Sequence, residues 1–347
     1  MIFRGPEDLQ NLGPAISENN NEKKKHIKTI TNLIYAAFAA VILATGAVTA
    51  NGALNDLYAS INGSGNGGGF IYEYNPGGVQ SIFASGLSRP RGAAFDHFGN
   101  LFVLTNTFDA VSGTFQPSIV KITPDGVQST FATISGDFFG SGLAIDGSGN
   151  VFVMAGDDTS PTGAATIYKF TPDGVQSTFG SVPGQGLGLA FDSAGNLFAA
   201  DFFDQTIYKF APDGTRSVFV DPSGFTPNSG PVGLAFDRFG NLFVSTESNG
   251  QEPDSILKFS PGGVGSPFAT DLNSPRGLAF DRGGNLFVAE IIQTGPGDIL
   301  KFTPNGVGTV FASGIGPAGN GGPEYLAVQP PTPRPLPTPH PRPHVGR

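Results

Sequence analysis

The chain has 347 residues, including 51 Gly, 29 Pro and 31 Phe, and only 14% of its residues are charged. This composition is typical of a turn-rich all-β protein with an aromatic core. The absence of Cys excludes disulfides, thiolate metal sites and catalytic thiols. The formal net charge of −9 argues against nucleic acid as a partner, because phosphate backbones are bound by basic surfaces.

Residues 1–50 resemble an export segment preceded by an extension. Lys23, Lys24, Lys25 and Lys28 precede an apolar run from Leu33 to Ala44, and Val48 and Ala50 occupy the −3 and −1 positions of a cleavage site. We therefore expect a removable signal peptide and a secreted, periplasmic or cell-envelope protein that begins at Asn51. The alternative is an uncleaved membrane anchor, because residues 30–50 approach the length of a membrane span.

Residues 51–329 contain a repeat that predicts their fold. The segment Gly-Leu-Ala-Phe at 277–280 has close counterparts that begin 44 to 50 residues apart, at 92, 142, 188 and 233. Each copy is followed by Asp-x-x-Gly-Asn, in which the Asp can bond loop amides and the Gly can take positive φ. This pattern predicts a strand, a tight turn and a second strand.

Two further strands complete the repeat. A third strand such as 207–210 ends in a Pro-x-Gly turn, and a fourth short strand such as 128–132 follows. Four antiparallel strands at this period define a propeller blade. The later strands occur six times, and segment 325–328 supplies the missing first strand. The prediction is therefore an all-β, six-bladed β-propeller whose ring is closed by strand 325–328 pairing with strand 57–60.

Residues 330–347 have Pro at nearly every second position and are predicted to form an extended Pro-rich tail outside the propeller.

The repeat resembles the NHL-repeat family, within the group of gluconolactonase-like six-bladed propellers. The resemblance rests on Pro-Arg-Gly-Leu-Ala-Phe-Asp-x-x-Gly-Asn-Leu-Phe-Val-Ala-Glu from Pro275 and on the following Ile-x-Lys-Phe-x-Pro-x-Gly, and it covers residues 55–328. It implies the fold but no particular activity, since relatives range from interaction scaffolds to lactonases and lyases. The Trp-Asp signature of another propeller family is missing.

The column of residues just before the first strand of each blade should ring the mouth of the central channel. Around the blades this column reads Glu324, Arg91, Ser141, Leu187, Val232 and Arg276. The closing strand thus places a carboxylate between two guanidinium groups. We predict that Glu324, Arg91, Arg276 and Ser141 bind an anionic or hydroxylated ligand; the alternative is that the charges only help to close the ring.

A metal site is the second candidate at this end of the propeller. The lactonase relatives hold a divalent metal with a Glu, Asn residues and an Asp, but their Gly-Glu-Gly-Pro segment is absent here. Glu290, Asp201 and Glu324 are the candidate substitutes, for Ca²⁺ or another divalent cation. No catalytic residue is predicted, because the only propeller histidine, His97, lies in a turn.

These observations leave two functions open. Residues 51–328 carry 24 acidic and 11 basic residues, and most of the acids fall on the loops at the channel-mouth face, here called the top. Such a surface either keeps an exported protein dispersed or captures a cation or a cationic partner. The first hypothesis is an exported, monomeric, non-catalytic binding or scaffold protein whose acidic top face binds a protein, glycan or cell-envelope component. The alternative is a divalent-metal-dependent lactonase-like hydrolase.

Overall fold

A computed structural model describes residues 56–63, 66–136, 138–156, 163–248, 253–292, 296–316 and 322–330. The predicted signal segment and residues 331–347 of the Pro-rich tail lie outside the described residues. No helix in the described part of the chain is long and apolar enough to cross a membrane.

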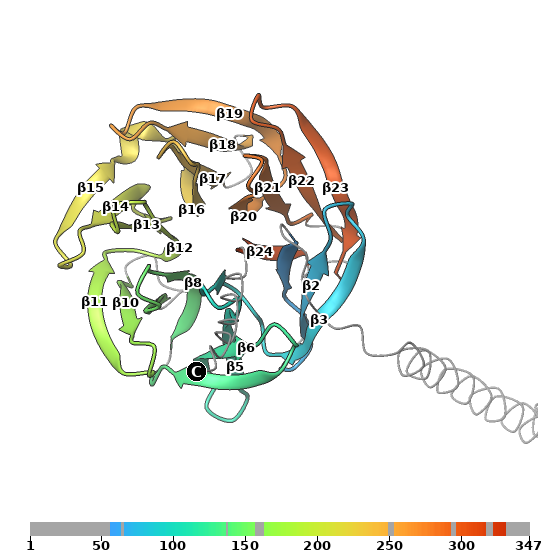
Figure 1. Ribbon diagram of the computed structural model, residues 1–347. Coiled ribbons are helices and arrows are strands. Elements are labelled where there is room, and N and C mark those ends of the chain that lie inside the picture. Colours follow the sequence, from blue (N-terminus) through green and yellow to red (C-terminus); the bar gives the residue numbers. More distant parts are fainter. Residues whose placement is uncertain are drawn as a thin grey trace, which may run out of the picture. The chain divides into compact units, whose positions relative to one another are not determined.

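The described residues form six four-stranded antiparallel sheets arranged as blades around a central channel (Figure 1). Blade 1 contains β24 (Pro323–Val328), β1 (Leu57–Ile61), β2 (Gly69–Tyr74) and β3 (Gln80–Leu87). Blade 2 contains β4 (Ala93–Phe95), β5 (Leu101–Asp109), β6 (Thr114–Ile122) and β7 (Gln128–Thr133). Blade 3 contains β8 (Phe139–Ile145), β9 (Val151–Gly156), β10 (Ala165–Phe170) and β11 (Gln176–Val182).

The second half of the ring repeats this order. Blade 4 contains β12 (Gly186–Phe191), β13 (Leu197–Asp201), β14 (Thr206–Phe210) and β15 (Arg216–Val220). Blade 5 follows a short 3-10 helix (Pro222–Gly224) and contains β16 (Ser229–Phe236), β17 (Leu242–Ser248), β18 (Asp254–Phe259) and β19 (Gly265–Leu272). Blade 6 contains β20 (Pro275–Phe280), β21 (Leu286–Glu290), β22 (Gly297–Phe302) and β23 (Gly308–Ile315).

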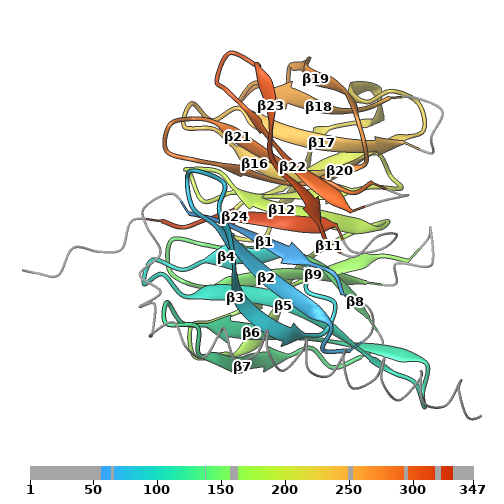
Figure 2. The same ribbon diagram turned by 90° about the vertical axis from the view of Figure 1, so that its right-hand side faces the viewer.

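The predicted ring closure is confirmed. β24 pairs antiparallel with β1, with Leu57 opposite Val328 and Ser60 opposite Tyr325. The Ser60 hydroxyl also accepts a hydrogen bond from the Tyr325 amide at 3.1 Å. Figure 2 shows β24 beside β1, so the last strand of the propeller lies next to the first.

The Asp-x-x-Gly-Asn turns have the structural role that the sequence predicts. In the first of them, Asp96 Oδ1 accepts from the amides of Phe98 and Asn100 at 2.9 Å, and Asp96 Oδ2 accepts from Asn100 Nδ2 at 2.7 Å. Gly99 has a φ of 84°, which a side chain would disfavour. The equivalent Asp residues also bond their Asn partners. These carboxylates are thus hydrogen-bonded within the turns that join first and second strands. We call these turns the bottom turns, because they lie at the end of the blades opposite the channel mouth.

Aromatic side chains between the blades account for the high Phe content. Phe243 of blade 5 contacts Phe268 of its own outer strand at a centroid distance of 4.9 Å and Phe280 of blade 6 at 5.0 Å, both edge to face. Lys258 Nζ lies 5.3 Å from the Phe243 ring centroid. Similar pairs recur between other blades. Each junction is therefore a repeated apolar cluster, and edge-to-face pairs favour this packing.

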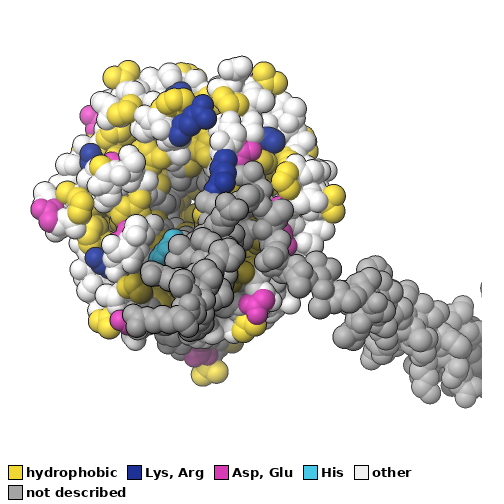
Figure 3. Space-filling view, viewed as in Figure 1, with side chains coloured by type: hydrophobic (Ala, Val, Ile, Leu, Met, Phe, Trp, Pro, Cys, Tyr) yellow, Lys and Arg dark blue, Asp and Glu magenta, His cyan; other side chains and the backbone are white. Residues whose placement is uncertain are grey.

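Apolar side chains are also exposed where Pro-x-Gly turns end. The Val after the turn is exposed in five blades, at Val79, Val127, Val175, Val264 and Val307. Figure 3 shows apolar side chains spaced around the outer edge of the propeller. Singly exposed apolar residues are common on protein surfaces, so we assign these no function.

Ring closure gives a first prediction. A chain that ends at Gly322 lacks β24, so it exposes the edge of β1 and loses the buried Leu326 and Ala327. We expect its free energy of unfolding to fall by at least about 3 kcal/mol. A chain that ends at Gln329 keeps these contacts and should melt like the full chain. Thermal melts followed by circular dichroism would measure both, and equal melting temperatures would contradict the importance of closure.

Candidate functional site

Four of the six residues of the predicted column line a cavity at the top of the central channel, whereas Glu324 and Val232 do not. Arg91, Ser141, Leu187 and Arg276 all contribute to a cavity of about 210 Å³. They are held there by the starts of the inner strands, which surround the channel. The other lining residues come from the same end of the propeller, namely Phe139, Gln185, Phe202, Glu247 and Ser248.

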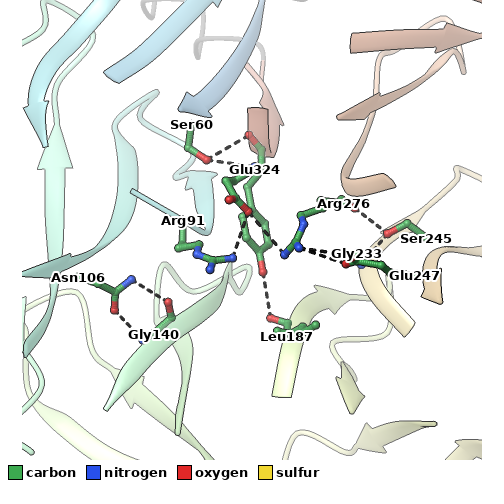
Figure 4. Close-up of polar contacts among 11 residues, drawn as sticks. Ser60, Arg91, Asn106, Gly140, Leu187, Gly233, Ser245, Glu247, Arg276 and Glu324 are labelled. Carbon is green, nitrogen blue, oxygen red and sulfur yellow. Dashed lines mark hydrogen bonds and ion pairs between the residues drawn. The ribbon is translucent and has the colours of Figure 1, made fainter. Parts of the chain in front are cut away.

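The expected pairing of Glu324 with two arginines is present. Glu324 Oε2 lies 3.1 Å from Arg91 Nη1 and 3.8 Å from Arg276 Nη1. Arg276 Nη2 lies 3.2 Å from Oε2 of a second carboxylate, Glu247. Figure 4 shows Glu324 between the two guanidinium groups, with Glu247 beyond Arg276. Two cations and two anions thus alternate across the channel mouth.

Burial strengthens these charge interactions. The Glu324 side chain is 8% exposed and the Arg91 side chain 15%. Burial alone would lower the pKa of Arg276, but the carboxylates of Glu324 and Glu247 raise it overall, so this guanidinium stays charged. Arg91 also lies over the Phe139 ring, with 4.8 Å between its Cζ and the ring centroid. This contact fixes the guanidinium against the cavity wall.

Both arginines retain an unused donor. Nε of Arg91 and Nε of Arg276 are buried and have no hydrogen-bond partner among the described residues. An unsatisfied buried donor is costly, and buried polar groups normally find a protein, water or ligand partner. Both residues line the cavity through other atoms, since the two Nε atoms themselves are buried.

The three candidate metal ligands are not brought together. Asp201 ends β13 in blade 4, where its carboxylate accepts from the amides of Gly184 at 2.8 Å and Asp204 at 3.1 Å. Glu290 ends β21 in blade 6 and accepts from the Asn273 amide at 2.8 Å. Both therefore hold the loop that precedes the first strand of their own blade. Within the described ranges, no three His, Cys, Asp or Glu side chains are grouped as a metal site.

Glu324 is also a poor ligand for a divalent cation. Its carboxylate lies between two guanidinium groups, which repel a second cation. The residues therefore do not fit the divalent metal that the resemblance implies, and a bound Ca²⁺ stays a prediction without a ligand set in the described chain.

Three acidic residues that the sequence assigns to the top face are buried in the structure. Asp201, Glu290 and Glu324 are 0%, 4% and 6% exposed. They contribute little to an exposed acidic surface, although the sequence places them on the top loops. Their buried positions could not be read from the loop pattern, because the side chains turn inward to cap backbone amides or pair with arginines.

Sequence reasoning missed several residues of the mouth. Phe139 and Phe202 form apolar walls, and Glu247 pairs with Arg276. Phe139 and Gln185 lie two residues before members of the predicted column, a spacing that could have indicated them. Phe202 and Glu247 lie at or beyond the top ends of second strands, where only the folded ring shows which side chains turn toward the channel.

Comparison with known proteins extends the fold assignment. No protein-family model matches the chain, and no curated protein matches it in sequence. A protein of unknown function from Bacteroides caccae has a TM-score of 0.55 at 13% identity, covering 80% of this chain and 99% of that one. A catalytically inactive virginiamycin B lyase from Staphylococcus aureus, solved with Quinupristin, has a TM-score of 0.51 at 16% identity, covering 75% and 86%. A gluconolactonase from Xanthomonas campestris has a TM-score of 0.46 at 18% identity, covering 65% and 77%.

The chain is a six-bladed β-propeller with a polar cavity at its channel mouth. More particularly, its fold is similar to that of the virginiamycin B lyase from Staphylococcus aureus.

The ion pairs of the mouth give a second prediction. Glu324→Gln removes the carboxylate shared by Arg91 and Arg276, leaving two poorly solvated cations close together. We expect the free energy of unfolding to fall by about 1–3 kcal/mol. Glu247→Gln is the matched control, because Glu247 is more exposed and pairs with Arg276 alone; it should cost less than about 1 kcal/mol. Urea unfolding measures both, and equal losses would show that the shared position of Glu324 is unimportant.

The buried Glu290 gives a third prediction. Burial raises its pKa, although the Asn273 amide partly opposes this. A carboxyl with a raised pKa binds more protons in the folded protein, so its contribution to stability falls as pH rises above its unfolded pKa of about 4.3. Glu290→Gln keeps an acceptor for Asn273 and loses this dependence. Relative to wild type, the variant should therefore become more stable between about pH 4 and neutrality.

Urea unfolding across this pH range tests the prediction. Asp213 supplies an opposite control, because hydrogen bonds from Thr215 lower its pKa. Asp213→Asn should become less stable relative to wild type as pH rises to about 3.9 and should show a constant difference above about pH 5, where Glu290→Gln still changes. A pH-independent difference for Glu290→Gln would contradict the assignment for Glu290.

Proposed function

We propose that the channel mouth binds a small hydroxylated or anionic molecule. The carrying observation is that the guanidinium side chains of Arg91 and Arg276, 15% and 23% exposed, line the same cavity among the described residues. Guanidinium groups form strong, directed hydrogen bonds to carboxylate and hydroxyl oxygens. The two carboxylates keep the mouth nearly neutral, which suits a ligand with several hydroxyl groups as well as a charged one.

The shape and lining of the mouth support a small ligand. Ligand sites are concave, with apolar walls and a few well-placed polar groups. Phe139 and Phe202 provide such walls beside Arg91 and Arg276. The cavity of about 210 Å³ is below the range of about 300–1,000 Å³ usual for drug-sized ligands, so it suits a smaller molecule.

The similar structures also support a small-molecule ligand. The virginiamycin B lyase from Staphylococcus aureus was solved with Quinupristin, so a propeller of this fold can hold such a ligand. Other similar structures bear the names of enzymes, which favours the hydrolase alternative over a scaffold. The described residues supply no histidine at the mouth and no grouped metal ligands, so we derive no catalytic step.

Titration calorimetry with D-gluconate, a hydroxylated anion, tests the proposal. We expect binding to the wild-type protein and an affinity loss of at least about tenfold in Arg276→Gln and Arg91→Gln, since each loses charge-assisted hydrogen bonds. Arg282→Gln, in a bottom turn, is the matched control and should bind like wild type. Absence of wild-type binding, or equal binding by the mouth variants, would overturn the proposal.

Metal analysis of the purified protein separates binding from metal-dependent hydrolysis. A stoichiometric divalent metal that survives dialysis, together with lactone hydrolysis that chelation abolishes, would establish the hydrolase alternative. Ligand binding without bound metal and without lactone turnover would establish a binding protein. In either case the mouth variants show whether Arg91 and Arg276 hold the molecule.

A further inference from the structure

Tyr325 occupies a position that is Gly in every other blade. It directly follows the mouth column, and the equivalent residues are Gly92, Gly142, Gly188, Gly233 and Gly277. A Cβ added at any of these glycines would lie 2.0 to 2.5 Å from an atom of the next blade's inner strand, closer than real contacts allow. Neighbouring inner strands therefore require Gly at this level, and only the closing strand carries a side chain there.

The Tyr325 side chain crosses the channel. Its hydroxyl donates to the carbonyl of Leu187 at 3.4 Å. Tyr325 belongs to blade 1 and Leu187 to blade 4, which are opposite each other in a six-bladed ring. Figure 4 shows the contact at Leu187, which lies across the channel from Glu324. Burial raises the pKa of the Tyr325 hydroxyl to about 12, so it remains a neutral donor.

A second space lies along the channel, lined by apolar side chains with polar backbone groups exposed between them. It has a volume of about 190 Å³ and is lined by the residues that follow the glycine level, together with Tyr325 itself. In five blades this residue is Leu, namely Leu143, Leu189, Leu234, Leu278 and Leu326. The sixth is Ala93, so the ring of leucines has one gap. We call this space the leucine chamber; it shares no lining residue with the mouth cavity.

We propose that Tyr325 separates the mouth cavity from the leucine chamber and so determines specificity, confining ligands to the polar mouth and excluding alkyl or aryl extensions from the leucine chamber. The mouth part of this inference rests on the proposed function, whereas the separation of the two spaces does not. Removal of the ring would join a charged mouth to an apolar chamber. The combined space would accept a carboxylate with an alkyl chain, because apolar burial then adds to the charge-assisted hydrogen bonds.

Calorimetry with sodium octanoate tests the separation. Tyr325→Ala should bind octanoate at least about tenfold more tightly than wild type does, since methylene groups gain an apolar environment. Tyr325→Phe retains the ring and should resemble wild type. The double variant Tyr325→Ala with Ala93→Leu places a leucine at the one gap in the lining, narrows the chamber and should reduce the gain. No gain in Tyr325→Ala, or an equal gain in Tyr325→Phe or in the double variant, would overturn the proposal.

The outcomes distinguish this inference from the proposed function. If Tyr325→Ala gains octanoate affinity but the wild-type protein does not bind D-gluconate, Tyr325 separates the two spaces and the proposed mouth ligand is rejected. If the wild-type protein binds D-gluconate but Tyr325→Ala gains no octanoate affinity, the mouth ligand is supported and the separating role of Tyr325 is rejected. If Tyr325→Ala does not fold, Ala93→Leu in the wild-type background decides: an unchanged or raised melting temperature supports an open chamber beneath Tyr325, and a lowered one contradicts it.

Discussion

The pairing of β24 with β1 is the interaction on which the rest of the propeller depends. It joins Pro323–Val328 to Leu57–Ile61 and completes the first blade. The same pairing carries Glu324 and Tyr325 into the channel, where the other blades present arginine, serine or apolar residues followed by Gly. The carboxylate that bridges two arginines and the side chain that spans the channel therefore come from the strand that closes the ring. Stability and the candidate site have a common origin.

The fold could be predicted from the sequence because its determinants are local and repeated. The Asp96 turn contains its donors, acceptor and positive-φ Gly within five consecutive residues, and four further copies keep the Asp and Asn partners. Repetition also fixed the number of blades and exposed the missing first strand. The Arg91, Glu324 and Arg276 column followed from the same alignment, because equivalent positions in a ring must lie at one level.

The directions of the side chains at the candidate site could not be predicted, because they depend on contacts across the ring. Asp201 and Glu290 were plausible metal ligands in sequence, but each caps an amide of its own blade. Their direction follows from the path of the inter-blade loop, which no repeat specifies. The significance of Tyr325 was likewise hidden, since its partner Leu187 lies 138 residues away. Side chains on variable top loops, such as Phe202, were unpredictable for the same reason.

Closure by the final strand has a kinetic consequence. The hydrogen bond between Ser60 and Tyr325 joins residues 265 positions apart, and such long-range contacts form late because the chain must first lose loop entropy. During synthesis, the other blades and three strands of blade 1 are complete before β24 emerges. Until then β1 presents an unpaired edge that can pair with another chain. Pairing of the last strand, Pro323–Val328, with β1 covers this edge and completes the first blade.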